Sequence, residues 1–147
     1  MTAEDIKNLR EKTGAGVMDA KRALEEAGGD MDRAIEVIRE KGIAKAEKKA
    51  DRTTGAGIIF SYIHNERIGV MLALRCETDF VARTDDFKGL AHDIAMQIAA
   101  MDPENVEELM AQPYIKDQGT TVENLIKGVI AKVGENMQIE KFCRYAL

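Results

Sequence analysis

The residue types that most often carry metal or redox chemistry are sparse in this sequence. It holds two histidines, His64 and His92, and two cysteines, Cys76 and Cys143. Zinc sites usually contain ligand pairs separated by only a few residues, and these four side chains offer no such pair. Both cysteines lie in apolar, strand-like stretches, which is typical of reduced thiols in a protein core. We therefore expect no metal site, and free thiols rather than a disulfide.

The sequence also contains no clear motif for nucleotide binding or acid–base catalysis. The glycine-rich stretches at 13–16 and 53–57 lack the GxxxxGK[ST] and GxGxxG spacings that cradle phosphate groups. The adjacent carboxylates of Asp85 and Asp86 are explained by the start of a helix, where such residues act as caps. No cofactor and no catalytic residue is predicted, so an enzyme is the weakest of the function classes considered.

One stretch does invite a functional interpretation, ETDFVARTDDF at residues 77–87. In it Phe80 lies among charged residues, directly after the most apolar run of the chain. Thr78 can cap a short helical turn and place Asp79 and Phe80 in its first turn. An aromatic ring at such a corner can either fold back onto the core or project outward to enter a partner. The residues alone leave these two hypotheses equal.

The segment 1–41 predicts three short helices that form a small bundle of limited stability. Thr2 begins a capping box, and the glycines at 13–16 end the first helix. Asp30 caps the third helix, which we expect to end at Gly42. The second helix has an apolar stripe that we assign to the bundle core, consisting of Val17, Ala20, Leu24 and Ala27.

Residues 42–56 have no apolar periodicity and predict a linker that is partly helical. Four basic residues in it could form a contact patch, namely Lys45, Lys48, Lys49 and Arg52. Glu47 and Asp51 interrupt that run, so a solvated helical connector is the favoured interpretation.

Residues 57–147 predict the main domain, because the apolar period changes to two at Gly57. Two strands flank a polar turn at 64–67, and helical stripes follow at 87–99 and 122–133. We expect a further short helix to start at Asp102 and Pro103, a cap at Thr120 for the last helix, and a closing strand. The fold class is α+β: a three-helix bundle, a linker, and a three-stranded antiparallel sheet with helices on one face.

Composition limits the function classes further. The chain has 147 residues, 45% of them hydrophobic and 32% charged, and a net charge of -5. An acidic balance disfavours general nucleic-acid binding, which needs clustered Lys and Arg. No run approaches the roughly 20 apolar residues that span a bilayer, and the N-terminus lacks the apolar centre of a signal peptide. We expect a cytoplasmic protein without a membrane or direct nucleic-acid partner.

Three segments, in this order, resemble the translation elongation factor Ts family: LREKTGAGVMDAKRALEEAGGDMDRAIEVIREKG at 9–42, CETDFVART at 76–84 and AKVGEN at 131–136. The resemblance runs over nearly the whole chain. It implies a guanine-nucleotide exchange factor that binds no nucleotide itself. The implied partner is elongation factor Tu, GDP-bound or nucleotide-free, and the bundle would be a ubiquitin-associated-like domain that docks on the GTPase.

The resemblance also implies three contact surfaces. In the exchange motif, Phe80 would wedge between helices of the GTPase, and Asp79 would disturb the groups that hold its Mg²⁺. The full motif is Thr78, Asp79, Phe80 and Val81. The bundle would contribute Lys7, Arg10, Val17, Met18 and Lys21, and a late edge of the surface would contain Val133 and Gly134.

This sequence departs from the family pattern in one respect. Between Met101 and Thr121 it has about twenty residues, where family members carry a longer segment. We therefore expect a compact form whose exchange activity depends on the bundle and the exchange motif. The weakly polar second face of the sheet, with Met71 and Ala73, leaves room for a homodimer. The alternative function is an interaction adaptor that binds a partner through the bundle without affecting nucleotide exchange.

Overall fold

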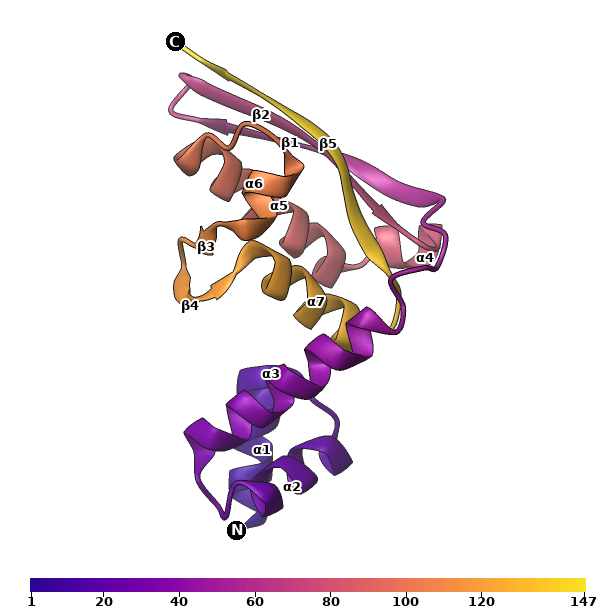
Figure 1. Ribbon diagram of the computed structural model, residues 1–147, viewed down its shortest axis with the longest axis vertical. Coiled ribbons are helices and arrows are strands. Elements are labelled where there is room, and N and C mark those ends of the chain that lie inside the picture. Colours follow the sequence, from indigo (N-terminus) through magenta and orange to yellow (C-terminus); the bar gives the residue numbers. More distant parts are fainter.

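The computed structural model describes all 147 residues, in two parts connected by one long helix (Figure 1). The N-terminal part is a bundle of α1 (Ala3–Thr13), α2 (Val17–Glu26) and α3 (Met31–Glu47). The larger part is a three-stranded antiparallel sheet with helices packed on one face. The predicted α+β class is confirmed. None of the helices is both long and apolar enough to cross a membrane.

Local capping fixes both ends of the first bundle helix as the sequence predicts. The N–H of Asp5 donates to the hydroxyl of Thr2 at 3.1 Å, and the N–H of Thr2 donates to the Asp5 carboxylate at 2.8 Å, which completes the capping box. Gly14 ends α1 in the left-handed conformation, with φ 74°. Val17, predicted to lie in the core, is instead 48% exposed. The small core consists of Leu9, Ala20, Ala23, Leu24, Ala34 and Val37.

The third helix does not end at Gly42, and this prediction is wrong. α3 continues to Glu47 because it packs along α7 (Val122–Val133). A β-carbon added at Gly42 would lie 3.4 Å from that of Ala131, so the two small residues let the helices approach closely. Ala46 is buried in the core of the larger part. The segment predicted as a solvated connector is therefore partly buried, and it attaches the bundle to the sheet domain.

The sheet has the strand order β1 (Ala56–His64), β2 (Ile68–Cys76), β5 (Met137–Ala146). The central strand β2 pairs antiparallel with both neighbours, and Leu72 lies opposite Phe60 on one side and Phe142 on the other. Its inward residues are buried, as the alternating pattern predicts: Val70, Leu72, Leu74 and Cys76.

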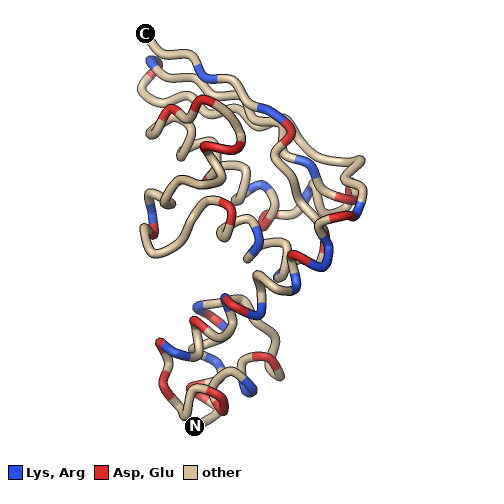
Figure 2. Tube along the Cα trace, viewed as in Figure 1, with Lys and Arg blue, Asp and Glu red and all other residues tan.

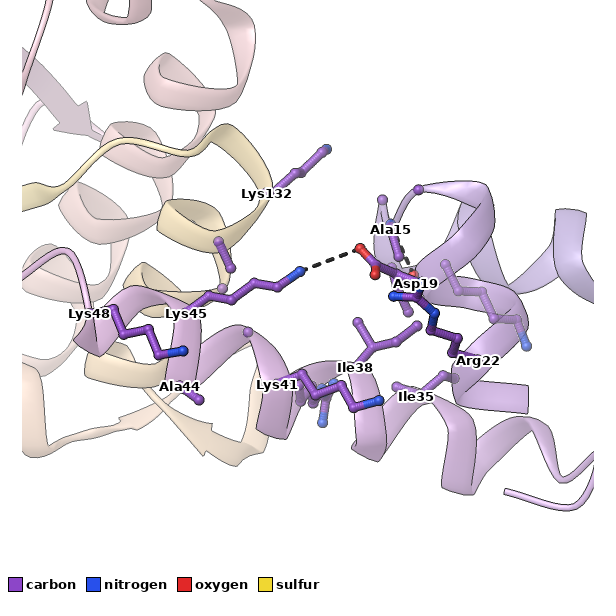
Figure 3. Close-up of a pocket in the computed structure, with 18 residues that line it drawn as sticks. Ala15, Asp19, Arg22, Ile35, Ile38, Lys41, Ala44, Lys45, Lys48 and Lys132 are labelled. Carbon is purple, nitrogen blue, oxygen red and sulfur yellow. Dashed lines mark hydrogen bonds and ion pairs between the residues drawn. The ribbon is translucent and has the colours of Figure 1, made fainter. Parts of the chain in front are cut away.

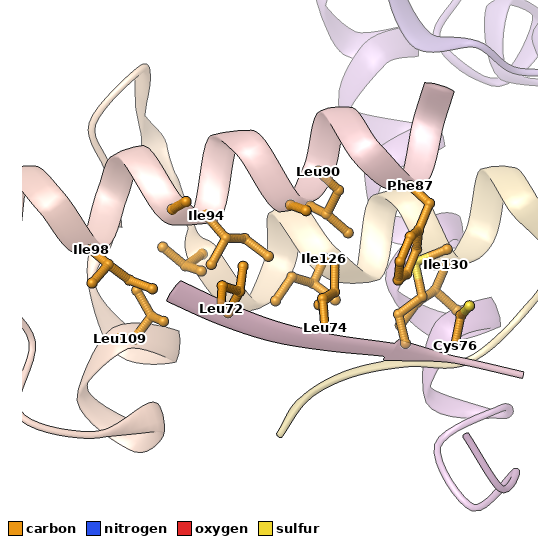
Figure 4. Close-up of a cluster of buried hydrophobic side chains, with 14 of the residues drawn as sticks. Leu72, Leu74, Cys76, Phe87, Leu90, Ile94, Ile98, Leu109, Ile126 and Ile130 are labelled. Atoms are coloured by element: carbon orange, nitrogen blue, oxygen red, sulfur yellow. The ribbon is translucent and has the colours of Figure 1, made fainter. Parts of the chain in front are cut away.

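Helix α5 (Asp85–Met101) covers this inner face (Figure 4). Phe87, Leu90 and Ile94 are almost completely buried, and they point toward the β2 side chains in the close-up. α7 packs beside α5 and adds Ile126 and Ile130 to the same cluster. The opposite face of the sheet has no helix on it and exposes Ile59, Ile63, Met71, Cys143 and Tyr145. The expectation that Cys143 is a core thiol is therefore wrong.

The segment between Met101 and Thr121 folds into α6 (Val106–Ala111) and a small hairpin of β3 (Pro113–Tyr114) and β4 (Asp117–Thr121). The hairpin was not predicted. The helix starts later than expected, with Asn105 as its cap, because Asp102 ends α5 in the left-handed conformation. Thr121, rather than Thr120, caps α7.

Buried Gln97 anchors this short segment to α5. Its side-chain NH2 donates to Gln112 and to the carbonyl of Pro113, both at 3.1 Å, and its carbonyl accepts from the N–H of Ile115 at 2.9 Å. A buried amide with all these partners fixes the position of the segment. The twenty residues thus form a compact end to the core of the sheet domain.

Gly57 lies near the start of β1, where the strand comes close to the backbone of β2, and a substitution there tests this close approach. Its φ is 154°, and an added β-carbon would lie 2.3 Å from the carbonyl oxygen of Leu74. We expect Gly57→Ala to lower the free energy of unfolding by about 1–3 kcal/mol, because the substitution adds strain and a backbone clash. Urea denaturation would measure this loss. Gly55→Ala is the matched control, since a β-carbon there meets no atom within 4 Å; equal effects of both changes would contradict the explanation.

Candidate functional site

Thr78 to Val81, to which the resemblance assigns nucleotide exchange and which we call the exchange motif for that reason, lie at the corner between β2 and α5. The strand ends at Cys76, and the chain then forms the one-turn helix α4 (Asp79–Ala82), which lies at the tip of the sheet domain (Figure 1). Thr78 caps this turn as predicted, because its hydroxyl oxygen accepts from the N–H of Val81 at 3.2 Å.

The side chains of α4 point in two directions. Phe80 is 81% exposed, and Asp79 is exposed beside it. Val81 and Ala82 are 7% and 4% exposed and pack into the core cluster. The structure therefore excludes the hypothesis that Phe80 folds back onto the core. It also separates Val81 from the rest of the motif, because this side chain holds the turn from inside.

Glu135, which the sequence analysis did not identify, contacts the exchange motif directly. Its carboxylate accepts hydrogen bonds from the N–H groups of Glu77 and Thr78, both at 3.1 Å, and from the Thr78 hydroxyl at 2.8 Å. The residue follows Gly134 in the segment AKVGEN, more than fifty positions along the chain from the motif. No local sequence pattern connects two such distant positions. The sequence contains only one indication of Glu135: it lies in AKVGEN, one of the three segments that resemble the family.

Cys76 also contacts the motif, as a neutral hydrogen-bond donor. Its Sγ donates to the carbonyl of Thr78 at 3.2 Å. Burial raises the pKa of the Cys76 thiol, and the nearby carboxylate of Glu135 raises it further. A thiol with a raised pKa is a poor nucleophile, so its part here is structural.

The late edge named by the resemblance lies next to the motif. Val133 is half-buried, and Gly134 ends α7 in the left-handed conformation with φ 91°. The carbonyl of Gly134 accepts from Arg52 at 3.4 Å. Arg52 also lies 3.7 Å from the carboxylate of Glu77. The structure therefore brings together the late edge, the end of the linker and the start of the exchange motif.

The bundle surface is formed by α1 and α2, away from α4 (Figure 1). All five of its predicted residues are exposed: Lys7, Arg10, Val17, Met18 and Lys21. Met18 is 56% exposed and Val17 is 48% exposed, so the second helix begins with two apolar side chains in solvent. An apolar pair bordered by cations suits a partner surface that combines apolar and acidic groups.

A groove of about 600 Å³ lies between the bundle and α7 (Figure 3). Seven of its lining residues are basic and one, Asp19, is acidic. The basic residues are Lys12, Arg22, Arg39, Lys41, Lys45, Lys48 and Lys132. Lys45 pairs with Asp19 at 3.4 Å across the groove. Both charge signs occur along the whole chain (Figure 2). The lining of this groove is mostly basic, although the protein as a whole has a net negative charge.

The ion pairs at the junction connect the bundle to the sheet domain. Arg39 of α3 pairs with Asp117 of β4 at 3.0 Å, and Glu47 pairs with Lys127 of α7 at 3.2 Å. Two of the four basic linker residues, Lys45 and Lys48, line the groove rather than forming a separate patch. No cluster of three or more His, Cys, Asp or Glu side chains is placed to hold a metal ion.

Known proteins are similar in sequence to this chain over its whole length. A family model described as elongation factor TS matches residues 77–147, from the exchange motif to the end of the chain. Elongation factor Ts of Petrotoga mobilis is 43% identical over 193 aligned positions that cover all of this chain and 98% of the relative. Elongation factor Ts of Thermotoga maritima is 45% identical, over 97% of this chain and 94% of the relative.

A third relative, elongation factor Ts of Gloeothece citriformis, is 46% identical over all of this chain and 68% of its own length. The alignment with the Petrotoga protein has 193 positions for a chain of 147 residues, so the relative contains residues for which this chain has no counterpart. With such identity over so much of both sequences, this chain belongs to the elongation factor Ts family.

Proposed function

We propose that this protein is a guanine-nucleotide exchange factor for elongation factor Tu. It binds the GDP-bound or nucleotide-free GTPase, promotes the release of GDP by disturbing the Mg²⁺ and phosphate site, and allows GTP to bind. Membership of the elongation factor Ts family supports its place in translation. Its expected compartment is the cytoplasm, and it needs no cofactor and no catalytic residue of its own.

The observation that carries this proposal is the exposure of Phe80. A phenylalanine that is 81% exposed on a helix of four residues contributes almost nothing to the stability of its own fold. Its burial in a partner would remove most of a large apolar side chain from water, which is the usual role of an aromatic anchor in an interface. Val81 and Ala82 hold the turn from beneath, so the ring projects from a fixed base.

The mechanism follows from reciprocal coupling between two binding events. If Phe80 moves helices of the GTPase and Asp79 repels or displaces the groups around Mg²⁺, the deformed site holds GDP less well. Loss of Mg²⁺ removes the cation that neutralises the diphosphate, and moved backbone amides lose charge-assisted hydrogen bonds. GDP must then weaken the binding of this protein by the same factor; a coupling of ~3 kcal/mol corresponds to about 150-fold.

The bundle surface supplies affinity rather than the exchange step itself. Its residues lie on a separate part of the molecule from α4, so the two surfaces can hold a GTPase at two places. The short segment between Met101 and Thr121 folds onto this protein's own core, which supports a compact form that depends on these two contacts. The exposed sheet face with Met71 leaves room for a homodimer.

The two phenylalanines of the opening stretch provide a matched test of the exchange motif. We expect Phe80→Ala to abolish most of the acceleration of GDP release and to leave the melting temperature nearly unchanged, because the ring is exposed. Phe87 is completely buried, so Phe87→Ala should lower the free energy of unfolding by about 3–5 kcal/mol. Release of fluorescent GDP from elongation factor Tu and thermal unfolding would measure both effects.

Tyr145→Ala is the control for a surface aromatic, since Tyr145 is 78% exposed at the far end of β5. It should leave GDP release unaffected. If the unaltered protein binds the GTPase at saturation without changing GDP release, the exchange function is wrong and the adaptor function replaces it.

Asp79 is expected to act on the partner's metal site. Asp79→Asn keeps the size of the side chain and removes its charge, so the variant should retain binding but lose part of its effect on Mg²⁺. We expect the dependence of GDP release on Mg²⁺ concentration to become weaker in the variant. Identical Mg²⁺ dependence for both proteins would remove Asp79 from the mechanism. Asp85→Asn, in the first turn of α5, is the control for a neighbouring carboxylate.

Met18 is expected to contribute to binding alone. Met18→Asp places a charge in the apolar part of the bundle surface, so it should weaken the affinity for elongation factor Tu about tenfold or more. The rate of GDP release at saturating concentration should remain that of the unaltered protein. Met101→Asp is the control, because Met101 is 48% exposed at the end of α5. A loss of the saturating rate in Met18→Asp would show that the bundle takes part in the exchange step.

A further inference from the structure

The carboxylate of Glu135 occupies a position from which it can set the orientation of the exchange motif. The residue lies in the loop between α7 and β5. β2 ends at Cys76, so the N–H groups of Glu77 and Thr78 lie beyond the last paired residue of the strand. Glu135 accepts from both of them and from the Thr78 hydroxyl. One side chain thus serves three donors where the strand turns into α4.

The Thr78 hydroxyl connects Glu135 to α4. It donates to the Glu135 carboxylate at 2.8 Å, and its oxygen accepts from the N–H of Val81 at 3.2 Å. A threonine hydroxyl can donate once and accept at the same time, so one group fills both roles. Hydrogen bonds to a carboxylate are charge-assisted and stronger than neutral ones. Because isolated helices of this length do not persist in water, the four residues of α4 depend on such contacts for their orientation.

The loop that carries Glu135 is itself held in place. Asn136 is 3% exposed, and its side-chain NH2 donates to the carbonyls of Ala50 at 3.3 Å and Arg52 at 2.9 Å. These carbonyls belong to the segment that follows α3. The carboxylate therefore extends from a fixed loop toward the motif.

We propose that Glu135 is the positioning residue of the exchange motif, an inference that rests on the proposed exchange function. Phe80 is 81% exposed and has almost no packing of its own to fix its direction. Glu135 holds Thr78, Thr78 caps α4, and α4 directs Phe80 toward the GTPase. Glu135 acts through these residues and does not touch the partner's nucleotide.

The test compares two carboxylates of the same part of the chain. Glu135→Ala removes all three hydrogen bonds to the motif, so it should lower the rate of GDP release at saturating protein by about tenfold or more. Glu135→Gln should show a smaller loss, because its carbonyl can still accept from the two N–H groups while its NH2 cannot accept from Thr78. Glu140→Ala is the control: Glu140 lies on β5, pairs with Arg75 at 3.2 Å and makes no contact with the motif. An equal loss in Glu140→Ala would overturn the assignment.

A double variant shows whether Glu135 acts through Phe80. If it does, adding Glu135→Ala to Phe80→Ala should cause little further loss of GDP release, since the group being positioned has already been removed. A merely structural role would reduce the activity in both backgrounds by the same factor. A full, independent loss in the double variant would therefore overturn the proposal.

Amide hydrogen exchange of the free protein separates this inference from the proposed function. The N–H groups of Thr78 and Val81 should exchange slowly in the unaltered protein, faster in Glu135→Ala, and unchanged in Glu140→Ala. If the unaltered protein fails to accelerate the release of GDP from elongation factor Tu, the exchange function fails, and these amides still decide whether Glu135 holds the motif. Equal exchange in Glu135→Ala and the unaltered protein would overturn the positioning role.

Discussion

The central strand β2 is paired on both edges and covered on its inner face, and the rest of the sheet domain depends on this arrangement. β1 and β5 supply hydrogen bonds along its whole length. α5 and α7 bury its inward side chains in one apolar cluster, namely Val70, Leu72, Leu74 and Cys76. A strand fixed in this way has a fixed end, so the corner that follows Cys76 starts from a rigid point. The proposed role of Phe80 as an anchor for a partner depends on this fixed base beneath it.

Small residues and ion pairs hold the bundle beside this rigid domain. The bundle has a core of six fully buried residues, none larger than leucine, which is little for an independent fold. α3 extends beyond it and packs against α7, where Gly42 and Ala131 permit close approach. Surface ion pairs such as Arg39 with Asp117 contribute only modestly. The close packing of the two helices therefore sets the separation of the bundle surface from the exchange motif.

Much of the fold follows from local signals that the sequence contains. Alternation of apolar residues located β1 and β2, and helical stripes located α5 and α7. Caps were predicted well where a single polar residue precedes a helix, as at Thr2, Asp30 and Thr78. The cap predictions failed at Asp102 and Thr120. Each has polar neighbours that can also cap a helix, and the packing of the preceding element decides which residue becomes the cap. α3 passed Gly42 for a related reason, because burial against α7 outweighs the intrinsic tendency of glycine to end a helix.

The sequence by itself determined the family, the class of fold and the composition of the exchange motif. Tertiary structure decided the direction of each motif side chain. Thr78 to Val81 are adjacent in sequence, yet Phe80 faces solvent and Val81 faces the core, since one helical turn points successive side chains about 100° apart. The tertiary structure also placed Glu135 in contact with Thr78, although the two residues are more than fifty positions apart in the sequence. Contacts between such distant positions depend on how strands and helices pack, and no local periodicity contains that information.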